Sequence, residues 1–402
     1  MKNIDVLVQN SKVGQLFFEN ESNIYGFNYT NDASPISLTM PYKPSSYKWK
    51  NRLHPIFDMN MPEGYLFEIF KNFLNKEHQR VDDFLIFSYL APNIQSRLTF
   101  KSWFEEEKFD SIDLDEILQN DSEESFLSIL KHFLHRSAIS GIQPKTLALL
   151  NDKNSLSTKE YIIKTWGSEY PDLALNEYFC LKAIEKANVP IPNIMLSKNK
   201  NFLVVERFNY DKKKDEFLGF EEILVLLGKN KDEKYDGSYE QIAKIVYSVT
   251  TDKTTSMKNL YKTIVMNYLL KNGDAHLKNF GILYDNEFEN VEFAPAYDVV
   301  NTVVYMFKDR PALSMFGKRV WSDKNTLLKF ATLHCYMSTR EAQAYYSECL
   351  NALEEIIYDL EKYISENIDF KKIGHRVLDV WKFSLKDLKV KELPSEIIRN
   401  WN

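Results

Sequence analysis

The spacing of apolar residues changes along the first hundred positions, and each spacing predicts a different kind of element. Residues 4–45 hold short apolar runs separated by Asn, Ser, Asp and Pro, which is typical of a small antiparallel sheet. Within residues 62–90 the spacing becomes three and four, as in YLFEIFKNFL and VDDFLIFSYL, which predicts amphipathic helices. This part of the chain therefore predicts an α+β unit.

The middle of the chain predicts a second sheet that carries one helix. Between residues 146 and 210 the runs TLALL, YIIKTW and NFLVVERF have the composition of short strands. A helical pattern lies between the last two, from Asp172 to a stop before Pro190, because the residue that precedes a proline disfavours helix. Residues 105–125 are acidic with scattered apolar positions, so we expect an exposed connection there.

From residue 218 onward helical spacing dominates, and Ser338 with Glu341 has the spacing of a capping box. One segment, residues 272–301, interrupts this pattern as loop, strand, turn and strand. Long irregular segments inside compact domains are usually functional. We expect three parts: an N-terminal subdomain at 1–105, a sheet-containing lobe at 106–210 and a helical lobe at 211–402.

Composition narrows the class of protein further. The content of 44% hydrophobic residues is typical of a globular protein. The net charge of −6 does not favour direct binding to the negatively charged DNA backbone, so we expect contact with DNA only through a partner. No stretch reaches the roughly 18 uninterrupted apolar residues of a membrane span, and the N-terminus lacks the apolar core of a signal peptide. The three cysteines lack CxxC spacing and fit buried free thiols. We therefore expect a cytoplasmic protein without membrane contact.

The sequence NGDAHLKN at residues 272–279 carries the most specific chemical signal. Asp274 and Asn279 flank four residues, and an apolar strand follows at once. Phosphoryl transfer needs a carboxylate that orients or accepts the proton of the nucleophile, and oxygen ligands for Mg²⁺ close by. We assign the first role to Asp274 and the metal to Asn279 and Asp298, which ends a second strand that can fold back as a hairpin. His276 could orient the loop at the cofactor or make a structural hydrogen bond, and we assign it no proton transfer.

Two upstream strands supply candidate contacts to a nucleotide. Lys164 lies in the middle of a predicted strand, among apolar residues. Its charge requires either a buried anion as a partner or a position on a solvated face of the strand, and the phosphates of ATP would be such an anion. Glu177 on the next helix could pair with Lys164 as the strand lysine and helix glutamate of protein kinases do, or could be a surface residue. Glu206 and Phe208 end a strand whose backbone could bind an adenine edge while the aromatic ring flanks the base.

A glycine-containing loop precedes the run TLALL. Glycine supplies only 12 of 402 residues, so its place beside polar groups at residues 140–145 is informative. Backbone N–H groups of a tight loop around Gly141 could face a phosphate. An ordinary turn that enters a strand is the alternative.

These features together resemble the HipA family of toxin serine/threonine kinases over most of the chain. The motifs that carry the resemblance are Pro62-Glu63-Gly64, Gly141-x-Gln143-x-Lys145, Ile163-Lys164, Asn176-Glu177-Tyr178, Val205-Glu206-Arg207-Phe208, Lys234-Tyr235, Asp274-x-His276-x-x-Asn279 and Tyr297-Asp298. The resemblance implies an α+β, two-lobed protein-kinase-like fold with a mixed α/β N-terminal lobe and a mostly helical C-terminal lobe. It also implies transfer of the ATP γ-phosphate, with Mg²⁺, to Ser or Thr of a protein. Gln143 and Lys145 join Gly141 in the implied phosphate loop.

The biological setting that the resemblance implies is a toxin-antitoxin system. Its known protein substrates are aminoacyl-tRNA synthetases, the outcome is growth arrest and persistence, and the partner is a helix-turn-helix antitoxin of the HipB type that binds operator DNA. Family members phosphorylate themselves on a serine just upstream of the loop glycine, which ejects the loop and switches the kinase off. Ala138 stands where we expect that serine. Either Ser137 or Ser140 has taken over the role, or Ala138 traps an active loop.

Three other functions share parts of this pattern. Phosphatidylinositol kinases share the Asp-x-His-x-x-Asn loop, but no cluster of Lys or Arg stands beside an apolar stripe, as a membrane face would require. Small-molecule phosphotransferases of the aminoglycoside kind usually have His two residues before the Asp, where this chain has Asn272. An inactive kinase fold that acts as a binding module stays open, and ATP hydrolysis or autophosphorylation would distinguish it.

Overall fold

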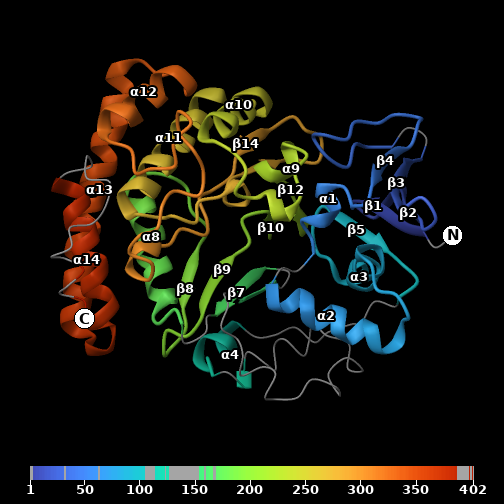
Figure 1. Cartoon of the computed structure of the whole chain (residues 1–402), viewed down its shortest axis with the longest axis horizontal. Coiled ribbons are helices and arrows are strands. Elements are labelled where there is room, and N and C mark those ends of the chain that lie inside the picture. Colours follow the sequence, from blue (N-terminus) through green and yellow to red (C-terminus); the bar gives the residue numbers. More distant parts are fainter. Residues whose placement is uncertain are drawn as a thin grey trace. The chain divides into compact units, whose positions relative to one another are not determined.

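The structure is a computed structural model, and Figure 1 shows its helices and strands along the chain. The chain divides into two compact units. It describes residues 3–30, 33–61, 64–104, 114–122, 124–125, 154–157, 160–165, 169–386, 398 and 401. Unit 1 comprises Met1–Glu169 and Ser197–Asp232, and unit 2 comprises Tyr170–Leu196 and Glu233–Asn402.

Unit 1 contains a five-stranded antiparallel sheet in the order β4-β3-β2-β1-β5. Its strands are β1 (Asn3–Val8), β2 (Ser11–Glu19), β3 (Ile24–Tyr29), β4 (Tyr47–Lys50) and β5 (Leu98–Lys101). Ile4 pairs with Leu16 and Leu16 with Phe27, and all three side chains are fully buried, so one face of the sheet forms a core. At Gly14 a Cβ would lie 2.4 Å from the Phe27 ring, so this ring needs the glycine. The predicted antiparallel sheet is confirmed, and β4 and β5 extend it.

Three helices lie between β4 and β5 in the chain: α1 (Pro55–Asp58), α2 (Gly64–Glu77) and α3 (Asp83–Leu90), the last leading into the short 3-10 helix η1 (Ala91–Asn93). The helices predicted within residues 62–90 are thus confirmed as α2 and α3. Phe87 of α3 packs edge to face against Phe57 of α1 and Phe100 of β5, with ring centroids 6.0 and 5.1 Å apart. These aromatic contacts join the helices to the buried side of the sheet.

A second set of antiparallel strands in unit 1 consists of β6 (Asn154–Ser157), β7 (Tyr161–Thr165) and β9 (Leu203–Glu206). The strands predicted at YIIKTW and NFLVVERF are confirmed, and TLALL lies outside the described residues. The other described elements of unit 1 are α4 (Leu114–Gln119), β10 (Tyr210–Asp211), β11 (Glu216–Phe217), β12 (Gly219–Glu222) and α9 (Ile223–Leu226), with the 3-10 helix η2 (Lys231–Glu233) at the junction with unit 2.

The prediction of an exposed connection at residues 105–125 is partly wrong. In its described part, Ile117 of α4 and the side chain of Asp121 are buried. Asp121 accepts hydrogen bonds from the Ser197 hydroxyl and from the backbone N–H groups of Asn199 and Asn201. The charge pattern of the sequence did not predict that Asp121 is buried, because its hydrogen-bond partners lie about eighty residues away in the chain, in the turn before β9.

Unit 2 is mostly helical. It contains α8 (Leu173–Lys186), β8 (Ile194–Leu196), α10 (Tyr239–Val249), α11 (Lys253–Leu270), η3 (Leu277–Asn279), β13 (Gly281–Tyr284), β14 (Val291–Phe293), η4 (Thr302–Val304), α12 (Lys324–His334), α13 (Thr339–Glu366), η5 (Ile368–Phe370) and α14 (Lys371–Lys386). The predicted loop, strand, turn and strand at residues 272–301 are confirmed, with β13 and β14 as an antiparallel hairpin. The capping box of Ser338 and Glu341 is also confirmed at the start of α13.

Helix α11 forms the centre of unit 2, where it contacts α8, α10, α13 and α14. Nearly every residue from Ser256 to Leu270 is buried. The buried Lys262 donates to the carbonyl of Ala187, 2.7 Å away, and pairs with Glu348 of α13, so its charge is compensated. Because α11 ends at the 272–279 loop, this packing gives the loop a rigid support.

Two observations concern the described residues as a whole. The cysteines Cys180, Cys335 and Cys349 are buried free thiols, as predicted. Within the described ranges, no helix combines the length and the apolar character that a membrane crossing requires.

His54 generates a prediction about acid stability. Its imidazole is buried at the start of α1 and its Nδ1 accepts a hydrogen bond from the Ile56 N–H, 3.2 Å away. Burial lowers the pKa of His54 from 6.5 to about 3, so the unfolded chain binds one proton more than the folded chain between these pH values. Stability should therefore fall as the pH drops from 6.5 toward 3.

The measurement is urea unfolding at a series of pH values for the wild type and for His54→Asn. Asparagine keeps a side-chain oxygen that can cap the helix but does not titrate. The variant should lose less stability than the wild type between pH 7 and pH 5. Equal losses would show that His54 is not neutral in the folded protein.

Candidate active site

The 272–279 loop begins where α11 ends. Lys271 caps the helix in the left-handed region, with φ of 59°, and its N–H donates to the carbonyl of Asn267. Its ammonium lies 4.8 Å from the ring centroid of Trp321, and burial lowers the pKa of Lys271 to about 8. The cap turns the chain sharply out of the helix and into the loop.

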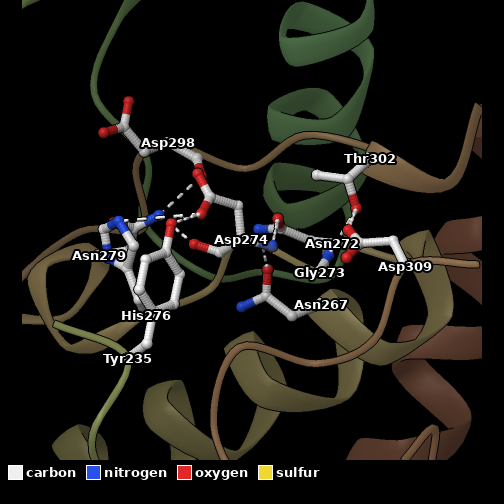
Figure 2. A network of polar contacts seen from close by, with 10 residues as sticks. All are labelled: Tyr235, Asn267, Asn272, Gly273, Asp274, His276, Asn279, Asp298, Thr302 and Asp309. Atoms are coloured by element: carbon white, nitrogen blue, oxygen red, sulfur yellow. Dashed lines mark hydrogen bonds and ion pairs between the residues drawn. The ribbon is translucent and has the colours of Figure 1, made fainter. Parts of the chain in front are cut away.

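Side chains on both sides hold the start of this loop (Figure 2). The Asn272 amide donates to Asn267 Oδ1 at 2.8 Å, and Asn272 Oδ1 accepts from the N–H of Asp274 at 3.1 Å. The N–H of Gly273 donates to Thr302 Oγ1 at 2.8 Å, and that hydroxyl donates to the carboxylate of Asp309. A Cβ on Gly273 would lie 1.9 Å from Asp309 Oδ2, so only glycine fits here.

Asn279 brings the two predicted aspartates together. Its Nδ2 donates to the backbone carbonyl of Asp274 at 3.0 Å and to that of Asp298 at 3.4 Å. Asp298 has a φ of 55°, a left-handed conformation that is uncommon outside glycine and tends to occur at functional sites. Three residues spread over 25 positions of sequence therefore meet at one point, which Figure 2 shows.

The oxygen atoms at this point suit a hard cation. Because the Nδ2 of Asn279 serves two carbonyls, its Oδ1 remains the ligating atom, and Asp298 supplies a carboxylate. No group of three or more His, Cys, Asp or Glu that could hold a metal occurs among the described residues. The residues that could hold magnesium at this point are Asn279 and Asp298, and phosphate and water oxygens would supply its remaining positions, as they do in phosphoryl-transfer sites.

Two aromatic side chains lie beside Asp274. The hydroxyl of Tyr235 donates to Asp274 Oδ1 at 2.9 Å, and Nε2 of His276 is 3.9 Å from the same oxygen. Burial lowers the pKa of His276 to about 4, so the ring is neutral near pH 7. Its Nδ1 is buried and has no hydrogen-bond partner among the described residues.

The remaining predicted residues are divided between the two units. Lys164 of β7 is buried, which excludes the solvated strand face, and Glu177 of α8 is fully buried, which excludes the surface role. Glu206 forms an ion pair with Lys212 at 2.9 Å, and Phe208 packs edge to face on another aromatic ring. The phosphate-loop candidates and their neighbours lie outside the described residues: Ser137, Ala138, Ser140, Gly141, Gln143 and Lys145.

The structure thus brings together Asp274, His276, Asn279 and Asp298 in unit 2. Lys164, Glu206 and Phe208 belong to unit 1, and the pairing of Lys164 with Glu177 stays a prediction.

Sequence reasoning missed three residues of this site: Tyr235, Thr302 and Asp309. Lys234-Tyr235 belonged to the motif set of the resemblance but had no chemical role. No sequence pattern pointed to Asp309, because the residue that it contacts, Gly273, lies 36 positions away in the chain. The scarce glycine next to Asp274 was the only local hint that another chain segment approaches the loop.

Comparisons with known proteins support the same chemistry. The family model described as the HipA-like C-terminal domain matches residues 137–357, and the model of the HipA N-terminal domain matches residues 4–101. A putative kinase of Haemophilus influenzae is 30% identical over 200 residues, which cover 46% of this chain and 58% of that protein. A putative kinase of Sinorhizobium fredii is 23% identical over 206 residues, 46% of this chain and 49% of that protein. The chain spans about half the length of these curated relatives.

Among solved structures, HipA of Shewanella oneidensis, determined with HipB and operator DNA, has a similar fold. Its TM-score is 0.69 at 14% sequence identity, and the match covers 95% of this chain and 96% of that chain. The predicted α+β, two-lobed protein-kinase-like fold, with a mixed α/β N-terminal lobe and a mostly helical C-terminal lobe, is confirmed.

The close approach at Gly273 generates a prediction about stability. Gly273→Ala should lower the free energy of unfolding by about 1–3 kcal/mol, because its Cβ would overlap the Asp309 carboxylate. Thermal unfolding measures this loss. The double variant Gly273→Ala/Asp309→Ala removes the overlap with the carboxylate and leaves only the carbonyl of Arg310, 2.9 Å from the added Cβ, so it should be more stable than the sum of the two single losses predicts. Strictly additive losses would contradict the proposed overlap.

Proposed function

Because this chain belongs to the HipA family, we propose that it is an ATP- and magnesium-dependent kinase that phosphorylates serine or threonine of another protein. The observation that carries the proposal is the side chain of Asn279, which hydrogen-bonds the backbone of both Asp274 and Asp298. One carboxylate for the nucleophile and two oxygen ligands for magnesium are what phosphoryl transfer requires.

Each of these side chains has a distinct role. Asp274, whose side chain is 47% exposed, orients the acceptor hydroxyl and accepts its proton. Asn279 and Asp298 hold magnesium through their side-chain oxygens. Magnesium, when bound, neutralises charge on the ATP phosphates. The neutral His276 supports the loop without exchanging protons.

The nucleotide would be bound by residues from both lobes. Lys164 and the loop residues Gly141, Gln143 and Lys145 contact the phosphates, and Lys164 pairs with Glu177. The burial of Lys164 and of Glu177 supports these roles, because a buried charge needs a compensating charge. The strand end at Glu206 and Phe208 receives the adenine. The division of the chain at residues 105 and 210 belongs to this proposal.

We also propose a helix-turn-helix antitoxin of the HipB type as partner. The similar Shewanella structure contains HipB and operator DNA, and the net charge of −6 supports contact with DNA only through that partner. The protein target would be an aminoacyl-tRNA synthetase, whose phosphorylation arrests growth and leads to persistence, and the setting is the cytoplasm. Ser137 and Ser140 are the candidate sites of autophosphorylation.

The catalytic carboxylate gives the first test. The wild type incubated with magnesium and γ-labelled ATP should release ADP and gain phosphate, which intact mass and peptide mapping of residues 131–150 would locate. Asp274→Ala should reduce transfer by about a thousand-fold or more, because the residue acts in the transition state. Its melting temperature should stay nearly unchanged, since the side chain is half exposed.

The matched control is Asp359→Ala, which removes an exposed carboxylate of α13 and should leave transfer unchanged. Full activity of Asp274→Ala would remove Asp274 from catalysis.

Asp298 gives a second test, directed at the metal. Asp298→Asn keeps the shape of the side chain but removes its charge, so the magnesium concentration needed for ATP binding should rise about ten-fold or more. Isothermal titration with ATP at several magnesium concentrations measures this dependence. The unfolding temperature without magnesium should match that of the wild type. An unchanged magnesium requirement would contradict the assignment of Asp298 as a ligand.

A further inference from the structure

Tyr235 contacts the proposed catalytic carboxylate and has no role in the mechanism above. Its hydroxyl donates to Asp274 Oδ1 at 2.9 Å, and Figure 2 shows the phenol directed at that oxygen. We propose that Tyr235 is a positioning residue that fixes the rotamer of Asp274 and leaves Oδ2 for the acceptor hydroxyl. The inference rests on the proposed function, since it requires that Asp274 receives the acceptor.

The backbone around Tyr235 is attached to the 272–279 loop. The N–H of Leu277 donates to the carbonyl of Lys234 at 3.1 Å. At Gly237 a Cβ would lie 2.9 Å from Leu277 Cδ2, so the segment packs closely against the loop. Residues 234–237 therefore move with the loop rather than independently of it.

A second segment holds Tyr235 from the other side. The guanidinium of Arg319 donates to the carbonyl of Tyr235. The N–H of Tyr239 donates to the carbonyl of Ser314 at 3.0 Å, and Ser314 in turn donates to the carbonyl of Gly237. Because both flanks are hydrogen-bonded, the backbone of Tyr235 is held in place, and the phenol, which is 42% exposed, reaches Asp274 from a fixed attachment point.

The ring of Tyr235 has its own support. It lies edge to face with His276, with centroids 5.1 Å apart and an interplanar angle of 79°. The His276 ring is itself buried, so the phenol rests on an immobile surface. Two contacts, one from the ring and one from the hydroxyl, thus define where Oδ1 of Asp274 lies.

This arrangement matters because a carboxylate has two equivalent oxygens and rotates readily about its last bond. A fixed donor on Oδ1 leaves a single oxygen and a single direction for the acceptor hydroxyl. Misplacement of a reacting group by about 1 Å can cost about a hundred-fold in rate. Tyr235 exchanges no proton in this scheme, so its contribution is orientation.

The test is Tyr235→Phe, which keeps the ring on His276 and removes only the hydroxyl. With magnesium and γ-labelled ATP, and with water and the chain itself as acceptors, kcat should fall by about 10- to 100-fold. The KM for ATP should stay within about two-fold of the wild type, because the phenol touches the carboxylate and no predicted nucleotide ligand. Tyr47→Phe, which removes a phenol hydrogen bond to the Pro41 carbonyl in unit 1, is the matched control and should keep kcat.

A double-mutant cycle separates orientation from a general loss of structure. If Tyr235 acts through Asp274, then Tyr235→Phe should have no further effect on the residual rate of Asp274→Ala. An equal fractional loss in both backgrounds, or a fall in melting temperature that tracks the fall in kcat, would overturn the positioning role.

The experiments distinguish a failure of the proposed role of Tyr235 from a failure of the proposed kinase function. An inactive Asp274→Ala together with a fully active Tyr235→Phe would refute only the role of Tyr235. Activity that survives Asp274→Ala, or a wild type that neither releases ADP nor gains label, would refute the proposed function and this inference with it.

Discussion

The side-chain amide of Asn279 is the contact on which the candidate site depends. Two hydrogens on one nitrogen reach two carbonyl groups, one from the loop after α11 and one from the loop after β14. The Tyr297 hydroxyl, which donates to the carbonyl of Lys278, and the Gly273 N–H, which donates to Thr302, also join the two loops, but the Asn279 amide contacts the backbone of both aspartates directly. The same contact orients the amide oxygen of Asn279, which is the atom proposed to bind magnesium.

The buried helix α11 gives that contact a fixed base. Its side chains are packed on all sides, and Lys271 ends it with a left-handed cap that turns the chain into the site. The bonds of Gly273 to Thr302 and of Thr302 to Asp309 then hold the loop from the opposite side of Asp274. Functional loops on rigid supports keep their geometry better than loops that depend on themselves. Tyr235 adds a further contact, a hydrogen bond from its hydroxyl to the side-chain carboxylate of Asp274.

Much of the fold followed from local patterns. The N-terminal sheet, helices α2 and α3, the strands β7 and β9, the hairpin of β13 and β14 and the capping box of α13 were all predictable, because alternation and helical spacing report which face of an element is buried. Within the site, the sequence singled out Asp274, Asn279 and Asp298, and the structure brings these three residues together, while their roles in phosphoryl transfer stay a prediction. The buried carboxylate of Asp121 was not, since an acidic stretch is ordinarily solvated and only its distant partners make burial favourable.

The amino-acid order alone was therefore enough to assign most elements and the candidate chemistry, since each of these depends on residues close together in the chain, and the family resemblance, since each of its motifs is only a few residues long. Folding in three dimensions decided what surrounds Asp274. Thr302, Asp309 and Tyr235 reach the loop over 29 to 39 positions of sequence, and each does so through a hydrogen bond or close contact. Such a contact leaves no periodic trace in the chain, because one polar atom at the right place satisfies it whatever the neighbouring residues are.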